Sequence, residues 1–194
     1  MKTLRIAPLL VALFMLVASS CERKANDNQE DAKEEAKDEN KEKFEDTDLK
    51  DDWKFAIDAA DDGMLEVELG KLAQTKAVST EVKNLAAVMV TEHTKANDEL
   101  KNLATQKNIS IPATLSDKSQ RKYDDLNGKS GKDFDEAYAK AMVDDHEDAV
   151  DLFKKEADKG NDPELKAWAA QKVPTLEHHL QMAKQAKDVA DKND

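Results

Sequence analysis

Glu66 and three of the four histidines interrupt series of apolar residues that recur at helical spacing. The three histidines are His93, His146 and His179, whereas His178 is adjacent to His179 and so points elsewhere. Because an unpaired buried carboxylate is very costly, Glu66 needs a partner. Three imidazoles and one carboxylate form a suitable tetrahedral or distorted site for one transition-metal ion, either Zn²⁺, Cu²⁺ or Fe²⁺.

Three methionines are spaced so that they share the faces of these histidines. Met89 and Met142 each stand four residues before a histidine, and Met182 stands three residues after His179. Thioether and imidazole ligands together favour copper, especially the reduced ion. We therefore predict Met89, Met142 and Met182 as additional ligands.

A second hypothesis explains the same residues without a metal. Methionine at helical spacing is usually core filler, and a buried network of Glu66 and the histidines can be purely structural. The protein would then be a non-enzymatic envelope interaction or stress module with a polar core. The acidic neighbours of the histidines, Glu92, Asp144 and Asp145, are assigned to the solvated faces of their helices.

Four long helices are needed to position these side chains. The apolar periodicity predicts them over residues 51–74, 79–107, 132–159 and 162–189. Ser79 is a good N-cap, Gly160 closes the third helix, and Pro163 follows the cap Asp162. The four ionisable residues lie at similar distances from the short turns, so we expect them to converge at mid-bundle.

The connection between the second and third helices is long and has consequences for the topology. Residues 108–131 include a predicted short helix over 116–126 and can run the whole length of the bundle. This length favours a ferritin-like crossover over a simple up-down bundle. Ferritin-type di-iron sites require two Glu-x-x-His motifs, but Val90, Val143 and Leu176 stand three residues before the histidines. A di-iron oxidase or an iron store is therefore not expected.

The N-terminus has the layout of a secretory signal. Residues 1–20 combine a basic start with an apolar run that is too short for a transmembrane helix, and Cys21 follows. Residues 17–21 resemble a bacterial lipobox, which implies that Cys21 is lipidated after cleavage. An ordinary signal peptide with an incidental cysteine is the alternative.

Residues 21–50 are predicted to form a lipidated, acidic and flexible tether. Residues 22–50 contain 12 acidic and 7 basic side chains and only two large apolar ones, Phe44 and Leu49. Such a stretch buries too little surface to offset its ordering entropy, so we expect it to be disordered or to form a fraying helix. The domain at 51–190 would then be anchored in the bacterial envelope, most simply at the outer membrane on its periplasmic or surface face. Its membrane contact would be through the lipid only.

Composition narrows the classes of function. The chain has 42 acidic and 30 basic residues, and its formal charge of −12 disfavours nucleic acid as a partner. It contains no nucleophile–base motif, P-loop or dinucleotide fingerprint, so we predict that it is not an enzyme. Its protein partner is not indicated.

The stretch from Phe55 to Ala186 resembles a known family. This is a ferritin-like family of unknown function whose members are often labelled as predicted outer-membrane proteins. The resemblance implies an all-α, ferritin-like four-helix bundle in the envelope and no known reaction. The matching segments are 66–73, 89–94, 131–135 with Tyr138, 142–146, and 173–176 with 179–180.

Overall fold

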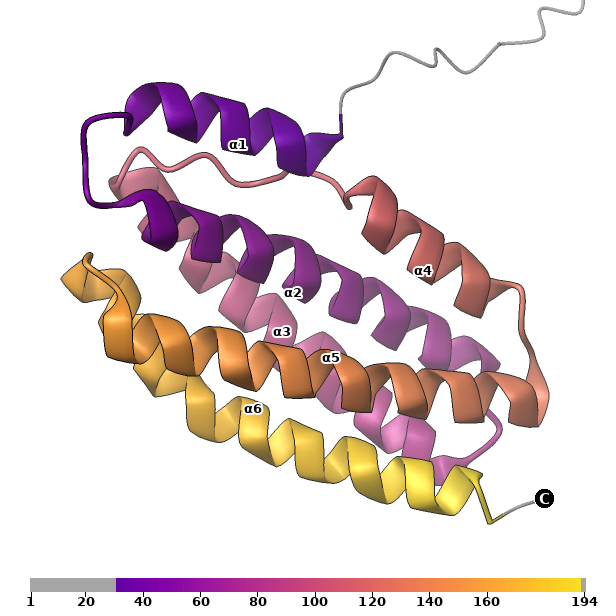
Figure 1. Ribbon diagram of the computed structural model, residues 1–194. Coiled ribbons are helices and arrows are strands. Elements are labelled where there is room, and N and C mark those ends of the chain that lie inside the picture. Colours follow the sequence, from indigo (N-terminus) through magenta and orange to yellow (C-terminus); the bar gives the residue numbers. More distant parts are fainter. Residues whose placement is uncertain (1–30, 193–194) are drawn as a thin grey trace, which may run out of the picture.

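The computed structural model describes residues 31–192. The predicted signal peptide, Cys21 and the first part of the predicted tether lie outside these residues. Within them the chain forms six α-helices and no strand, so the prediction of an all-α fold is confirmed (Figure 1). No helix among these residues has an apolar stretch long enough to cross a bilayer. The helices are α1 (Ala32–Lys43), α2 (Lys50–Lys76), α3 (Thr80–Gln106), α4 (Asp117–Asn127), α5 (Gly131–Lys159) and α6 (Pro163–Ala190).

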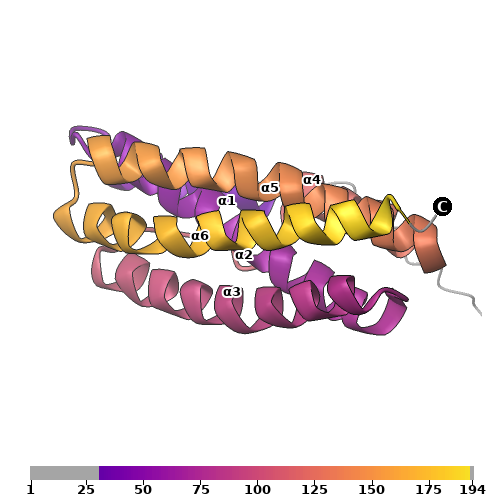
Figure 2. The same ribbon diagram turned by 90° about the horizontal axis from the view of Figure 1, so that it is seen from below.

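The four long helices form two antiparallel hairpins, α2 with α3 and α5 with α6. The connection through α4 runs the length of the bundle, so that α5 points in the same direction as α3 (Figure 1). Seen from below, α6 is flanked by α3 and α5 (Figure 2). The predicted crossover and its short helix are confirmed, and every predicted helix boundary lies within two residues of the observed one.

Two buried aspartates fasten the hairpins to each other. Asp135 of α5 accepts hydrogen bonds from the backbone N–H groups of residues 78 and 79, in the α2–α3 turn, with a shortest distance of 2.7 Å. Asp52 of α2 accepts from the N–H groups of residues 161 and 162, in the α5–α6 turn, at 2.8 and 2.6 Å. Each hairpin thus supplies the carboxylate that satisfies the turn of the other, which fixes their register.

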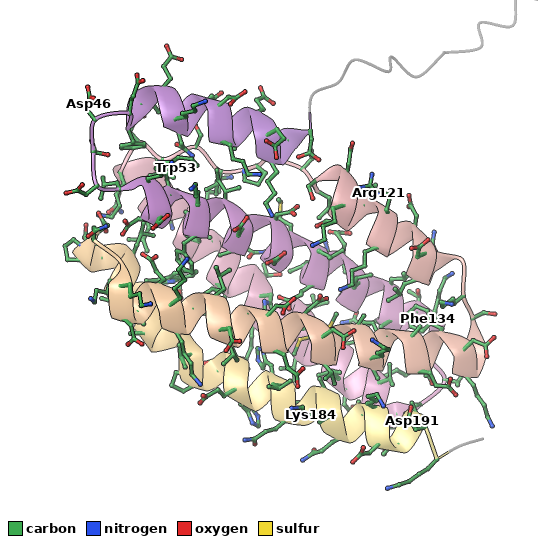
Figure 3. The ribbon with its side chains drawn as sticks, viewed as in Figure 1. Asp46, Trp53, Arg121, Phe134, Lys184 and Asp191 are labelled. Carbon is green, nitrogen blue, oxygen red and sulfur yellow. The ribbon has the colours of Figure 1, made fainter. Side chains whose placement is uncertain are left out.

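The bundle core consists of two hydrophobic clusters with a polar layer at their boundary. The first cluster lies toward the α5–α6 turn and contains Phe55, Phe153 and Trp168, whose ring centroids are 5.0 to 6.1 Å apart. The second lies toward the α2–α3 turn and contains Phe134 and Tyr138. On each long helix the boundary falls at Glu66, His93, His146 or His179. Charged side chains, such as those of Arg121 and Lys184, project from the outer surface (Figure 3).

Helix α1 corrects the prediction of a flexible tether for residues 31–50, the part of the segment 21–50 that the structure describes. The side chain of Asp31 caps the helix by accepting from the N–H of Lys33 at 2.9 Å. Asn40 is fully buried and exchanges two hydrogen bonds with the backbone of Ser110, at 2.7 and 2.8 Å. The helix therefore covers α2 and the crossover (Figure 1). The prediction failed because it counted only apolar surface, whereas specific polar contacts also offset the entropy of ordering.

A buried pair of carboxyl groups predicts how stability depends on pH. Burial, followed by the charge of Asp52, raises the pKa of Glu156 to about 7. The side chain is neutral in both the folded and unfolded protein below its ordinary pKa. As pH rises through about 7 it must ionise inside the fold, so its contribution to stability is lost.

We therefore expect Glu156→Gln to raise the melting temperature at pH 8 by about 2 to 4 °C and to change it little at pH 4. Thermal unfolding followed by circular dichroism at the two pH values measures this effect. Glu147→Gln is the matched control, since Glu147 is an exposed residue of the same helix that pairs with Lys184. Equal effects of Glu156→Gln at both pH values would contradict the prediction.

Candidate metal centre

The structure brings the three predicted histidines together in the polar layer at mid-bundle. His93 comes from α3, His146 from α5 and His179 from α6, and all three are buried. Their ring centroids form a triangle with sides of 5.1, 5.4 and 5.4 Å. Each can offer one nitrogen such that the three nitrogens lie within 4.8 Å of one another. The cluster is therefore compact enough to hold one metal ion.

His93 and His179 belong to a hydrogen-bonded chain that starts and ends at a carboxylate. Nδ1 of His93 lies 2.7 Å from Oε2 of Glu66, and Nε2 of His179 lies 3.0 Å from Oε2 of Glu92. A carboxylate accepts hydrogen bonds, so these outer nitrogens carry hydrogen. The inner nitrogens, Nε2 of His93 and Nδ1 of His179, then face each other at 3.2 Å with their lone pairs. A shared proton or a metal cation must relieve this arrangement.

His146 supplies the third donor atom of the site, its buried Nε2. Its Nδ1 donates to the backbone carbonyl oxygen of Met142 at 2.9 Å and lies 3.4 Å from Oε1 of Glu66. Its Nε2 is buried and has no hydrogen-bond partner among residues 31–192. Each imidazole thus has an outer acceptor that orients it, as metal-binding histidines usually do, and a second nitrogen free for a metal.

The pKa values of the side chains in the site depend on their burial and on the charges of their neighbours. Burial raises the pKa of Glu66, but the neighbouring His93 and His146 outweigh it and lower that pKa to about 2. Burial lowers the pKa of His93, but the Glu66 carboxylate outweighs it and raises that pKa. Burial and the other two histidines lower the pKa of His179 to about 4. Without a metal, the layer therefore holds an anionic Glu66, and a proton is favoured on His93 rather than on His179.

Two acidic residues contact the histidines. Glu66, a predicted ligand, contacts the outer nitrogens of His93 and His146, because a carboxylate pairs with imidazole N–H groups. Its role as a ligand stays a prediction. Glu92 is exposed, as its assignment to the solvated face implied, and it also binds His179 across the α3–α6 contact. Its position next to His93 in the sequence gave no signal for a contact with a different helix.

The three predicted methionines lie on one side of the histidines. Met89 and Met142 are fully buried in the second hydrophobic cluster, and Met182 packs against it. Each is one helical turn from its histidine, toward the α2–α3 turn. Their role as metal ligands stays a prediction.

A cavity of about 320 Å³ lies on the other side of the histidines. Its wall includes Gly63, Ala96 and Ala149, each of which stands one turn from Glu66 or from a histidine. The small side chains of Ala96 and Ala149 leave space next to the polar layer, whereas the place of a Cβ at Gly63 is taken by the side chain of Asn97. Farther from the layer, Phe153 and Trp168 also line the cavity.

Comparisons with known proteins found one family of unknown function and one similar solved structure. A family model described as "Domain of unknown function (DUF4142)" matches residues 25–186, which include α1 and nearly all of the bundle. A solved structure titled "CopM in the Cu(I)-bound form" is similar with a TM-score of 0.58 and 18% identity. The match covers 69% of this chain and 93% of that chain, and at this identity it shows a shared fold. No curated protein matches the chain. The ferritin-like label and the envelope location, which the resemblance implied, stay predictions.

Proposed function

The chain belongs to the DUF4142 family, a family of unknown function, and we propose that it binds one transition-metal ion at the three buried histidines. The ligand atoms are Nε2 of His93, Nε2 of His146 and Nδ1 of His179. Glu66 and Glu92 orient the rings from outside this set. The protein holds the ion without catalysing a reaction.

The observation that carries this proposal is the buried Nε2 of His146, which has no hydrogen-bond partner in the described part of the chain. Leaving a buried polar atom unpaired costs about 1–3 kcal/mol. The atom belongs to a cluster in which two further imidazole nitrogens face each other. A metal ion would pair all three nitrogens at once.

Copper(I) is the ion that we favour. Imidazole suits copper, zinc, iron and nickel alike, so the histidines alone do not choose among them. The layer formed by Met89, Met142 and Met182 supplies thioethers one turn away, and thioethers select Cu(I). The similar fold in CopM, which is titled as Cu(I)-bound, supports the same choice.

The proposed location is the bacterial envelope. The lipobox-like residues before Cys21 would give a lipid-anchored mature protein. Membrane contact would then be through the lipid, most simply at the outer membrane, with the bundle on the periplasmic or surface side.

A structural polar core is the second candidate, and one observation favours it. If the inner pair of His93 and His179 holds one proton, the chain from Glu66 to Glu92 is hydrogen-bonded without interruption. The raised pKa of His93 agrees with such a proton. In this case the site would hold no metal and would serve stability.

Metal analysis of the mature protein, purified without a histidine tag, tests the proposal. The protein is supplied with Cu(I) under anaerobic reducing conditions, or with Zn²⁺ separately, desalted and analysed by mass spectrometry of the elements. We expect stoichiometric metal in the natural protein and none in His93→Ala. Absence of stoichiometric metal from both proteins, after either ion is supplied, would overturn the proposal.

A further inference from the structure

The cavity beside the histidines has carboxylates in a mainly apolar wall. Asp62 and Glu66 of α2 and Glu92 of α3 line it. Glu92 is bound to His179, whereas Asp62 makes no hydrogen bond or ion pair with another residue in the described range 31–192. Asp62 is half-buried and precedes Glu66 by one helical turn, so the two carboxylates share a face of α2.

We propose that this cavity contains an outer cation site, where Asp62 and Oε1 of Glu66 receive a small hydrated cation before it reaches the histidines. This inference rests on the proposed function, because it assigns the route to the same metal centre. The class of ligand is a metal ion that carries water or other small neutral ligands. A metal held by an anionic chelator is a poor substrate, since three carboxylates outnumber the two lysines in the cavity wall, Lys95 and Lys172.

The orientation of Glu66 is the observation that points to a cation. Its Oε2 pairs with Nδ1 of His93, whereas Oε1 is buried, lies 3.4 Å from Nδ1 of His146 and has no hydrogen-bond partner among residues 31–192. Glu66 also lines the cavity. Because Oε1 has no hydrogen bond in this range and Glu66 lies on the same face of α2 as Asp62, this carboxylate oxygen attracts a positive ion into the cavity.

The size of the cavity and the residues that line it suit a site where a cation binds only transiently. A volume of about 320 Å³ corresponds to about ten water molecules, so an ion with six waters fits. The remaining wall is formed mostly by apolar side chains, such as Ala59 and Phe153, and by two lysines, none of which offers a ligand to a cation. An ion held at one end by two carboxylates is bound weakly there, and three imidazoles then replace its water.

The rate of Co²⁺ binding tests this inference, because absorption of bound Co²⁺ reports both the rate and the extent of loading. In stopped-flow experiments at low salt we expect Asp62→Asn to slow loading by about tenfold. The equilibrium affinity should change by less than about twofold, since a site on the route affects association and dissociation alike.

Asp58→Asn is the matched control. It removes the same charge one turn earlier on α2, but Asp58 lies outside the cavity and pairs with Lys33 at 2.8 Å. We expect it to leave the loading rate within about twofold of the natural value. Ala59→Leu, which fills part of the cavity, should slow loading without removing any charge.

The outcomes separate the inference from the proposed function. If the natural protein binds Co²⁺ at the histidines and Asp62→Asn loads at the natural rate, the outer site is wrong and the metal centre stands. If Asp62→Asn and Asp58→Asn slow loading equally, general charge is responsible and the inference is also overturned. If the natural protein binds no Co²⁺, no Zn²⁺ and no Cu(I), the proposed function itself fails.

Discussion

Replacing His146 by phenylalanine should lower the affinity of the protein for Cu(I) by at least about 100-fold while the bundle stays folded. The loss of a residue that only orients a ligand typically costs 10- to 100-fold in metal affinity, so the loss of a ligand should cost at least the upper value. Phenylalanine approximates the ring that it replaces, and His146 is fully buried. The substitution leaves His93 and His179 in contact.

The two candidate functions predict different results for this variant. In a purely structural core, phenylalanine removes the contacts of Nδ1 with the Met142 carbonyl oxygen and with Glu66, so the melting temperature should fall. No stoichiometric metal would be lost, because none would be bound. In the metal-binding protein, the variant should lose both the affinity and the stabilisation that Cu(I) gives to the natural protein.

Competition with a chromophoric Cu(I) chelator measures the affinity. His178→Phe is the matched control, because His178 is exposed on the same helix as His179 and undergoes the same chemical change. We expect this control to bind Cu(I) as the natural protein does. Binding by His146→Phe within about threefold of the natural value would show that His146 is not a ligand.

The long helices and their topology could be predicted because they depend on features that a sequence carries directly. Each long helix has an apolar stripe of period 3.6, and its ends fall at turn residues such as Gly160 and Pro163. The crossover followed from the number of residues between the second and third long helices. The convergence of His93, His146 and His179 followed from the same stripes, combined with their distances from the turns.

The site chemistry could not be predicted to the same depth, because spacing fixes the face and the height of a side chain but not its rotamer. Whether Glu66 contacts the inner or the outer nitrogen of His93 depends on such rotations. The contact between Glu92 and His179 joins residues 87 positions apart. The packing of helix α1 was not predicted for a related reason. The contact that holds it joins Asn40 to Ser110, 70 positions away, and sequence spacing does not reveal such a contact.

Buried aspartates are the other feature that the sequence did not reveal. Asp52, Asp61 and Asp135 are each nearly inaccessible to solvent, and each accepts hydrogen bonds from a segment outside its own helix. Such a carboxylate appears in a sequence as one more charged residue among 42 acidic ones. Its effect on stability is large because an unpaired polar group left in the core costs more than the hydrogen bond contributes.

Asp61→Ala should therefore lower the free energy of unfolding by about 4 kcal/mol, the largest stability effect that we expect from a single substitution in this chain. Asp61 accepts from the N–H of Ser116 at 2.8 Å, from its hydroxyl at 2.7 Å and from the hydroxyl of Ser119 at 2.8 Å. These contacts hold the start of α4, and thus the crossover, against α2. Alanine would leave three donors buried without their acceptor.

Urea unfolding followed by circular dichroism measures the change, and two variants show its cause. Lys33 lies 3.7 Å from Asp61 and 2.8 Å from the half-buried Asp58, so Asp58→Ala removes the other partner of this lysine and should cost less than about 1 kcal/mol. Asp61→Asn keeps one acceptor oxygen and should recover part of the loss. Folded Asp61→Ala should bind metal with the same affinity as the natural protein, since Asp61 contacts α4 and not the histidines. A loss below about 1 kcal/mol would mean that water replaces the carboxylate without penalty, and that α4 is held by its apolar contacts alone.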